Sequence, residues 1–180
     1  MIKGKNINLR HVRQEDLETL SALMNDVELK GDFARTNMKS PTLLKKEFEE
    51  NGLSGNVNEL FCITDKDGSL LGTVSHIQTV SYSTAREIGF SVFAQENRNK
   101  GYASEAVSLL TQYLFQTQPI NRVQICMPVA HKACEKLVKK CGFTLEGVIR
   151  GSIFVKGLYL DTYIYSILRT EYENIIKKCY

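Results

Sequence analysis

A basic loop that runs directly into an amphipathic helix is the stretch of this sequence best suited to chemistry. Segment 95–114 reads QENRNKGYASEAVSLLTQYL and places Arg98 and Lys100 just before Gly101. The first N–H groups of a helix lack intrahelical partners and lie at the positive end of its dipole, so they favour a phosphate group. Gly101 has no Cβ and therefore allows a ligand close to the backbone. The pattern predicts an anion-binding loop, with a solvated basic turn as the plainer alternative.

The helix that begins near Gly101 carries its apolar residues on one face. Polar residues occupy the other face, so the helix should pack one side against a core. The apolar set is Ala103, Ala106, Val107, Leu110, Tyr113 and Leu114, and the polar set is Ser104, Glu105, Ser108, Thr111, Gln112 and Gln116.

Length and composition predict one domain, residues 1–180, with an ordinary hydrophobic core. Apolar residues make up 43% and charged residues 24%, and a net charge of +3 is too small to argue for nucleic acid. The five cysteines lack C-x-x-C spacing, which argues against a disulfide framework and a zinc site. We therefore expect no metal. Neither a signal peptide nor a membrane span is indicated, so we expect no membrane contact and a cytoplasmic location.

The elements that would position this loop alternate between strands and helices. Asp67-Gly68 between two apolar runs predicts a hairpin, and Gly142 ends a helical pattern at the position where glycine is favoured. We therefore expect a mixed sheet flanked by helices. The predicted strands are Ile7–Val12, Glu59–Asp65, Ser69–Gln78, Ala85–Phe93, Arg122–Met127, Phe143–Val155 and Tyr159–Leu168; the predicted helices are Asp16–Val27, one from Pro41, one from Gly101, Ala130–Cys141 and Glu171–Lys178.

From Ile7 to Arg169 the order of elements resembles the GNAT acyltransferases, and its details resemble their RimJ/RimL branch. The resemblance implies an α/β (α+β) GNAT fold, with a mostly antiparallel sheet of six or seven strands and a splayed strand pair that holds acetyl-CoA. The matches that carry it are Leu9-Arg10-x-Val12-Arg13, Glu87-Ile88-Gly89-Phe90, Arg98-x-x-Gly101-x-Ala103 with Ser104-Glu105-Ala106, Lys140-Cys-Gly-Phe143 with Glu146-Gly147, and Asp161-x-x-x-Tyr165-Ser166.

The same resemblance implies where acetyl-CoA would bind. Backbone groups near Val92 and Phe93 would pair with the pantetheine amides. The loop would hold the pyrophosphate through its backbone N–H groups, and it comprises Arg98, Asn99, Lys100, Gly101, Tyr102, Ala103 and Ser104.

Two positions in the next predicted helix depart from the family pattern. His131 stands where the family usually has an asparagine that contacts pantetheine; it either replaces that contact or is an exposed loop residue. Cys134 stands where a serine is proposed to protonate the leaving thiolate, and it is either a thiol donor or a small core residue. The tyrosine that serves as general acid in many other members would fall at Val138.

Amide formation from a thioester requires a neutral amine, which separates the candidate acceptors. At neutral pH, deprotonation costs about 1 kcal/mol for an α-amine and about 4–5 kcal/mol for a lysine amine. Glu87 is the candidate general base, acting through water, although a salt-bridged strand residue is an equal alternative. Tyr165 is a candidate for orienting substrate or thiol, with packing as the alternative.

These expectations favour an acetyl-CoA-dependent N-acetyltransferase that modifies the N-terminal α-amine of a protein, of the ribosomal-protein type implied by the branch. A small amine such as a polyamine, amino acid or aminoglycoside is the first alternative. A non-catalytic module that binds CoA or a ribosomal partner is the second. The resemblance leaves a homodimer open.

Overall fold

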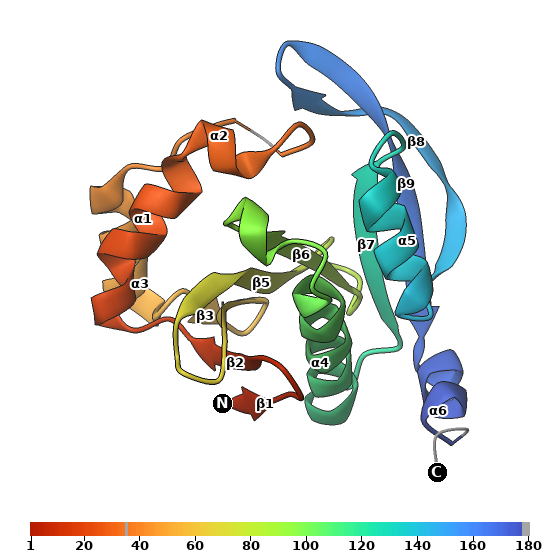
Figure 1. The fold of residues 1–180 in the computed structure, drawn as a ribbon. Helices are drawn as coiled ribbons and strands as arrows, with labels where there is room; N and C mark the ends of the chain where they lie inside the picture. Colours follow the sequence, from red (N-terminus) through yellow and green to blue (C-terminus); the bar gives the residue numbers. More distant parts are fainter. Residues whose placement is uncertain (35, 178–180) are drawn as a thin grey trace.

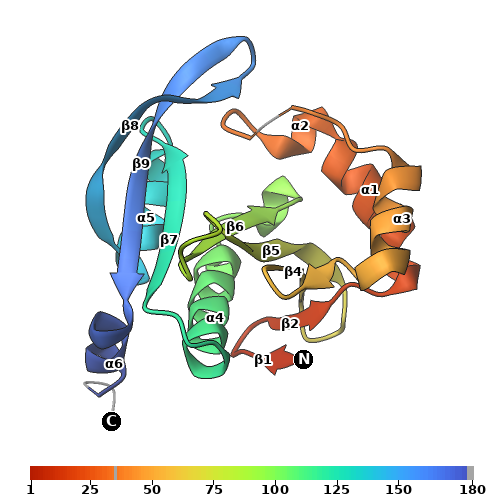
Figure 2. The same ribbon diagram turned by 180° about the vertical axis from the view of Figure 1, so that it is seen from behind.

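A single mixed sheet forms the frame of the molecule (Figures 1 and 2). The computed structural model describes residues 1–34 and 36–177, and within them the sheet has nine strands in the order β1-β2-β4-β5-β6-β7-β9-β8, with β3 paired to β4. The strands are β1 (Ile2–Lys3), β2 (Asn8–His11), β3 (Ser54–Gly55), β4 (Asn58–Thr64), β5 (Leu70–Gln78), β6 (Arg86–Val92), β7 (Arg122–Pro128), β8 (Thr144–Val155) and β9 (Leu158–Leu168).

The sheet consists of two halves that are joined where β6 meets β7. All other neighbouring strands pair antiparallel, whereas β6 and β7 are parallel and pair only at Arg86 with Val123 and at Glu87 with Gln124. Beyond Glu87 the two strands diverge, and the half formed by β7, β9 and β8 turns away from the other half (Figures 1 and 2). The predicted mixed, mostly antiparallel sheet with a splayed pair is confirmed; β1 and β3, each of two residues, are the strands that the sequence did not indicate.

Six α-helices within the described ranges cover the sheet. They are α1 (Leu17–Asn25), α2 (Val27–Lys30), α3 (Pro41–Asn51), α4 (Tyr102–Thr117), α5 (Lys132–Lys140) and α6 (Arg169–Lys177), with single 3-10 turns at Gln14–Asp16 and Gln95–Asn97.

The core is divided between the two faces of the sheet, because successive strand residues point to opposite faces. In β4, Phe61 and Ile63 belong to the large cluster under α4 and α5, whereas Cys62 between them belongs to a smaller cluster with Leu20 of α1 and Leu44 of α3. Helices α4 and α5 therefore cover one face, and α1 and α3 cover part of the other.

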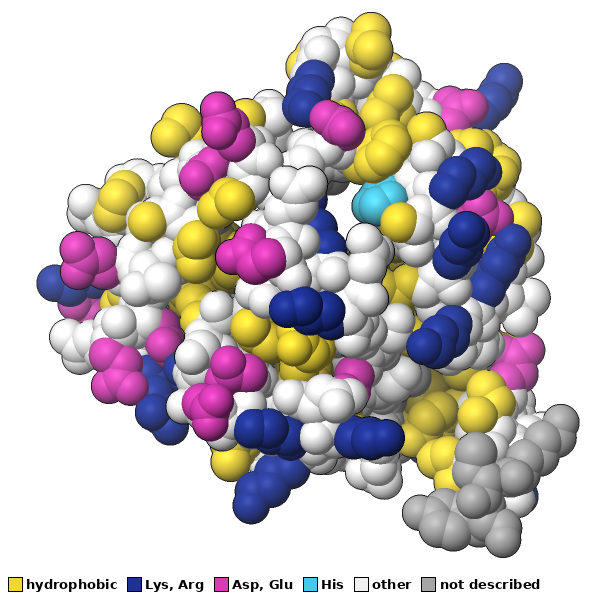
Figure 3. All heavy atoms as spheres, viewed as in Figure 1, with side chains coloured by type: hydrophobic (Ala, Val, Ile, Leu, Met, Phe, Trp, Pro, Cys, Tyr) yellow, Lys and Arg dark blue, Asp and Glu magenta, His cyan; other side chains and the backbone are white. Residues whose placement is uncertain are grey.

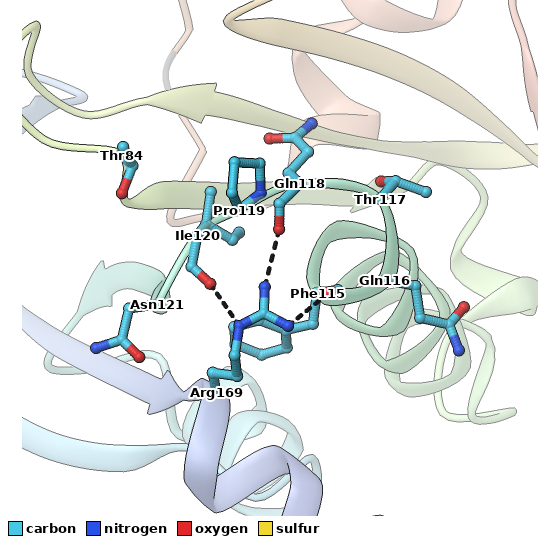
Figure 4. Close-up of a pocket in the computed structure, with 9 residues that line it drawn as sticks. All are labelled: Thr84, Phe115, Gln116, Thr117, Gln118, Pro119, Ile120, Asn121 and Arg169. Carbon is cyan, nitrogen blue, oxygen red and sulfur yellow. Dashed lines mark hydrogen bonds between the residues drawn. The ribbon is translucent and has the colours of Figure 1, made fainter.

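The C-terminal end of α4 is fixed by one arginine (Figure 4). Arg169 donates from Nε to the carbonyl of Ile120 (2.9 Å), from Nη1 to that of Phe115 (2.7 Å) and from Nη2 to that of Gln118 (2.8 Å). The last carbonyls of a helix lack intrahelical partners, and a cation is favoured there by the helix dipole. The open hollow of about 670 Å³ at this end is thus bordered by a structural helix cap.

Two local expectations for helices were wrong. The predicted helix Asp16–Val27 is broken at Asp26, whose side chain accepts from the N–H groups of Glu28 (2.9 Å) and Leu29 (3.1 Å) and so starts α2 as a separate turn. On α4, Thr111 was placed on the polar face, yet it is only 3% exposed, because the apolar face is wider than its strictly hydrophobic residues indicate. Of the predicted last helix, Lys178 lies outside the described residues.

Candidate active site

Beyond Glu87, where β6 and β7 are no longer paired, the two strands are separated by an opening. The edge of β6 that faces this opening carries backbone groups without a strand partner. On its other edge β6 pairs with β5 from Arg86 to Val92, and Phe93 N donates to Leu71 O at 3.1 Å. Alternate residues of an antiparallel strand direct their N–H and C=O groups to the same neighbour. Because Phe93 points its N–H at β5, the backbone groups of Val92 point to the opening. A chain of amides can therefore pair with β6 at Val92.

Phe93 differs from its expected role. Its N–H is already donated to Leu71, and its side chain is 6% exposed in the small cluster beside α1 and α3. Phe93 therefore anchors the end of β6, and Val92 is the member of the predicted pair whose N–H faces the opening, while its carbonyl accepts from Arg98 Nε at 3.5 Å.

The start of α4 has the geometry of an anion site. Gly101 is the N-cap residue with φ of 85°, Asn99 before it has φ of 61°, and within the described residues no side chain caps this helix. Glu105, in the first turn, instead accepts from Asn6 N at 2.9 Å. The intrahelical bonds begin with Glu105 N, which donates to Gly101 O, so the N–H groups of Tyr102, Ala103 and Ser104 are free for a ligand. A Cβ on Gly101 would meet nothing within 4 Å, so the space over the loop is open.

The guanidinium of Arg98 is directed away from that space. Its Nη2 donates to the carbonyl of Leu29 in α2, and its Nε lies 3.5 Å from Val92 O. Lys100 is exposed. The loop therefore offers an anion its backbone N–H groups first, and the side chain of Arg98 ties α2 to the end of β6.

His131 lies at the start of α5 and caps it. Its Nδ1 accepts from Cys134 N at 3.4 Å, and its ring stacks on Phe33 at a centroid distance of 4.7 Å. Burial lowers the pKa of His131, and the positive charge of Arg98 lowers it further. We assign the neutral tautomer with hydrogen on Nε2, because Nδ1 must accept. The Nε2–H is then the group that His131 can offer to a ligand.

Cys134 lies on the core face of α5 and is 8% exposed. Burial raises the pKa of its thiol to about 12, with Cys141 adding to the effect, so Cys134 stays protonated at neutral pH. An ordinary thiol has a pKa of about 8.5, so transfer of the Cys134 proton to the CoA thiolate would be uphill. Cys134 can donate a hydrogen bond more readily than it can give up its proton.

Tyr165 is fully buried, with 0% exposure, and its hydroxyl is committed to α5. The hydroxyl donates to Glu135 Oε1 at 3.2 Å, and the same carboxylate binds Lys132 (3.1 Å) and Lys139 (2.8 Å). Burial raises the pKa of Tyr165, and the charge of Glu135 adds to this. The contact favours the packing alternative for Tyr165.

Glu87 lies at the last position where β6 and β7 are paired. Its side chain is on the face of the sheet opposite α4, because its neighbour Ile88 belongs to the core under α4. Glu87 Oε2 accepts from Gln124 Nε2 at 2.9 Å and from Cys126 Sγ at 3.5 Å. Gln124 and Cys126 were not predicted as site residues, although their alternation with the apolar residues of β7 places them on this polar face.

The surface around the opening is hollowed between the region of α2 and that of α5 (Figure 3), and lysine and arginine side chains gather over α5. This helix contributes Lys132, Lys136, Lys139 and Lys140, which add positive potential on the side of the anion loop. No group of His, Cys, Asp or Glu that could hold a metal ion occurs in the described part of the chain. A helix that could span a membrane does not occur among the described residues.

Comparison with known proteins places this site in a family. The profile of the acetyltransferase (GNAT) domain matches residues 6–144. YdaF of Bacillus subtilis, a protein provisionally named a ribosomal N-acetyltransferase, is 34% identical over 108 residues, which are 60% of this chain and 58% of YdaF. Spermidine N(1)-acetyltransferase of Vibrio cholerae is 23% identical over 171 residues, 95% of this chain and 98% of that protein.

Solved structures agree in fold. Spermidine N-acetyltransferase from Vibrio cholerae, in complex with CoA and spermine, superposes with a TM-score of 0.83 at 22% identity and covers 95% of this chain and 100% of that one. RimL, a ribosomal L7/L12 alpha-N-protein acetyltransferase in complex with coenzyme A, has a TM-score of 0.81 at 18% identity and covers 93% and 97%.

The residues present suit acetyl-CoA. Its pyrophosphate matches the free N–H groups at the start of α4, and its pantetheine amides match the free edge of β6 at Val92. The basic loop before α4, the divergence of β6 from β7 and the match to the GNAT profile all indicate the same family. The chain belongs to the GNAT acetyltransferases and is an N-acetyltransferase that takes its acetyl group from acetyl-CoA.

Proposed function

We propose that the acceptor is the free α-amine of a protein N-terminus, of the ribosomal-protein type. The observation that carries the proposal is the state of the carboxylates on α3, one of the helices on the face that Glu87 occupies. Each is paired with a lysine: Glu47 with Lys39, Glu49 with Lys45 (3.8 Å) and Glu50 with Lys46 (3.8 Å). A polycationic acceptor would be favoured by uncompensated carboxylates, and here that charge is already balanced.

The chemistry of the amine supports the same acceptor. Among the described residues, the hydrogen-bond partners of Glu87 are an amide and a thiol, so no second base is bonded to this carboxylate. Removal of a proton from an α-amine at neutral pH costs about 1 kcal/mol, against about 4–5 kcal/mol for a lysine amine. A single carboxylate that acts through water suffices for the first and is poorly matched to the second.

In this proposal each residue has a limited task. The N–H groups of Asn99 to Ser104 and the edge of β6 at Val92 hold acetyl-CoA in the opening. Glu87 receives the proton of the amine through water, and Cys134 contributes at most a hydrogen bond to the leaving sulfur. Holding the amine next to the thioester supplies most of the acceleration, since proximity alone is worth about 7–11 kcal/mol.

A small polyamine is the second candidate acceptor. Its support is the likeness to spermidine N(1)-acetyltransferase, which extends over 95% of this chain, whereas the likeness to YdaF extends over 60%. The pairing of the α3 carboxylates with lysines argues against this acceptor.

The test is thiol release from acetyl-CoA with a panel of amines. It includes peptides with free Ser, Ala, Met or Asp N-termini, the same peptides with blocked N-termini and an internal lysine, and spermidine, spermine and aminoglycosides. Turnover with free N-termini and none with blocked peptides is the expected result. Turnover with spermidine alone would overturn the proposed acceptor and leave the acetyltransferase assignment in place.

The role of Glu87 is tested with the active acceptor. Glu87→Gln should lower kcat about 100-fold, the usual scale of general-base catalysis, and leave CoA affinity unchanged. Glu50→Gln, on the exposed side of α3, is the matched control and should keep normal kcat. Normal kcat in Glu87→Gln would exclude the base role.

A further inference from the structure

A row of hydrogen-bonded polar side chains crosses four strands on the face of the sheet that carries Glu87. Glu146 of β8 binds Ser166 of β9 and, at 2.6 Å, Nη1 of Arg122 in β7. Arg122 Nε donates to Gln124 Oε1 at 3.4 Å, and Gln124 Nε2 donates to Glu87 Oε2 at 2.9 Å. The row thus starts at the outermost strand of one half of the sheet and ends on the candidate base in the other half.

The chemistry of the row fixes the orientation of its amide. A guanidinium can only donate and an ionised carboxylate can only accept, so only one of the two orientations of the Gln124 amide satisfies both neighbours. Arg122 therefore determines that the NH₂ group of Gln124 faces Glu87. Arg122 Nη1 also donates to Ser166 Oγ at 2.9 Å, which fixes the guanidinium to β9.

The amide also keeps the charge of Glu87 available. An arginine bound directly to a carboxylate stabilises its ionised form and makes it a weaker base. Here the cation is one residue removed, and the direct partners of Glu87 are the neutral Gln124 amide and the Cys126 thiol. Gln124 can fix the position of the carboxylate without neutralising it.

The contact between Glu87 and Gln124 lies where β6 and β7 part. Glu87 and Gln124 form the last backbone pair before β6 and β7 diverge, so the carboxylate stands where the opening begins. Gly89, the next β6 residue on this face, is exposed, and a Cβ there would meet only Ser75 Oγ at 3.5 Å. The space beside Glu87 is thus open to an acceptor.

We propose that Gln124 and Arg122 are positioning residues that hold the Glu87 carboxylate at the opening, with Gln124 in direct contact and Arg122 acting through it. The inference rests on the proposed base role of Glu87. It predicts that both residues affect turnover only through Glu87, and that neither contributes to acetyl-CoA binding.

A double-mutant cycle separates positioning from a structural role. Gln124→Met keeps the length of the side chain and should lower kcat about 10-fold with the KM for acetyl-CoA within about two-fold, as expected for a residue that assists a base. In a Glu87→Gln background the same change should alter kcat by less than about two-fold, because coupled residues are not additive. Gln112→Met, on the exposed face of α4, is the matched control.

Arg122 is tested in the same way with a conservative partner. Arg122→Met should lower kcat by a smaller factor than Gln124→Met, because the amide stays next to Glu87 and loses only its fixed orientation. Arg122→Lys should restore part of the loss. Equal losses from Gln124→Met in both backgrounds would overturn the proposal, as would a Gln124→Met enzyme of normal kcat.

A measurement without substrates distinguishes this inference from the proposed function. Cys126 donates to Glu87, and burial together with that carboxylate raises the pKa of its thiol to about 12. Its labelling by iodoacetamide in the substrate-free protein should become several-fold faster in Glu87→Gln, because the neighbouring negative charge is lost. Gln124→Met should show a similar increase if Gln124 holds the carboxylate in place. An unchanged rate in Gln124→Met beside a faster one in Glu87→Gln would overturn positioning, whatever acceptor the enzyme uses.

Discussion

The two edges of β6 are held in different ways. On one edge β6 pairs with β5 at every residue from Arg86 to Val92, whereas on the other it pairs with β7 only at Arg86 and Glu87. Beyond Glu87, side chains from the N-terminal half reach across the opening. Phe33 stacks on His131, and Asp32 binds Lys156 at 3.0 Å in the tip of the β8–β9 hairpin (Figure 1).

One edge of β6 is therefore held rigidly by β5, whereas the contacts across the opening on its other edge can adapt. The hydrogen bonds to β5 fix the backbone of β6, so in the proposed binding mode the free edge would need no ordering when acetyl-CoA binds. Among the described residues, a ring stack and an exposed ion pair reach across the opening, and both kinds of contact are weak. Changes on the β5 side should therefore cost most, and changes across the opening least.

The largest effect is expected where β5 and β6 approach most closely. Gly72 pairs with Val92, and a Cβ on Gly72 would lie 2.1 Å from the carbonyl oxygen of Ser91. Because the obstacle is backbone, Gly72→Ala must push the end of β6 away from β5. We expect a loss of about 3 kcal/mol in the free energy of unfolding, the upper part of the usual range for overpacking. Urea denaturation measures it.

Gly89 provides the control in the same pair of strands. A Cβ there meets only Ser75 Oγ at 3.5 Å, an ordinary contact, so Gly89→Ala should change the free energy of unfolding little. If both variants unfold alike, the close approach at Gly72 does not hold β6 in place.

The second effect concerns the loop that follows the free edge. Gly101→Glu places a carboxylate over the free N–H groups of α4, where it competes with a phosphate, and should lower CoA affinity more than about 100-fold. Gly68→Glu is the matched control, since Gly68 has φ of 94° and open space around it, as Gly101 has with φ of 85°. Calorimetry with CoA should give a normal Kd for Gly68→Glu. A normal Kd for CoA in folded Gly101→Glu would show that the pyrophosphate does not bind at this loop.

The paired edge of β6 was predicted from the sequence better than the edge that faces the opening. The alternation of Ile88, Phe90 and Val92 and the periodicity of α4 are local patterns, and they correctly predicted β6 and its helix. The point where β6 and β7 part is not encoded in such a pattern, because the same alternation continues on both sides of Glu87. The family resemblance implied only that the strand splays near Val92 and Phe93; the structure confirms a splayed pair and places the start of the divergence after Glu87.

Contacts across the opening were beyond sequence reasoning. Phe33 lies in a segment that reads as polar and irregular, and its partner His131 follows about half the chain later. For Tyr165 and Arg98 the residue type indicated a site, but the structure gives each side chain a partner elsewhere: Glu135 for the first and the carbonyl of Leu29 for the second. Residue type and position do not determine where a long side chain points.

The ring stack across the opening should have an intermediate effect. Phe33→Ala removes the ring that holds His131 beside the opening, and aromatic pairs contribute about 0.5–1.5 kcal/mol beyond burial, so the KM for acetyl-CoA should rise by up to about 5-fold while Tm falls by only about 2–4 °C. Tyr82→Ala, at a residue that is 90% exposed, is the control and should leave KM unchanged. A large loss of Tm in Phe33→Ala would mean that this contact holds the two halves together and is not adaptable.

The pH dependence of stability should report the cap of α5. The pKa of His131 is lowered in the folded protein, so below its ordinary value of about 6.5 the unfolded chain binds a proton that the folded chain does not. That contribution to stability is complete above about pH 6.5 and is lost as pH falls. His131→Asn keeps a capping side chain that does not titrate, so its Tm should decline less between about pH 7 and 5. His11→Asn is the control, and an equal decline in all three proteins would contradict the assignment.

The smallest effect is expected for the ion pair between Asp32 and Lys156. Their side chains are 86% and 46% exposed, and exposed pairs of this kind contribute little because water and salt screen them. Asp32→Asn should raise the KM for acetyl-CoA by less than about two-fold at low salt, and the difference should vanish at about 0.5 M salt, where the screening length is only a few ångströms. Glu49→Gln, which removes a comparable exposed pair from α3, serves as the control and should have no effect on KM at any salt concentration. If Asp32→Asn raised the KM for acetyl-CoA more than about five-fold and the increase persisted in high salt, the effect would exceed what a screened ion pair can provide. The tip of the β8–β9 hairpin would then be fastened to the N-terminal half as firmly as β6 is to β5, and the distinction between a rigid edge and an adaptable one would no longer hold.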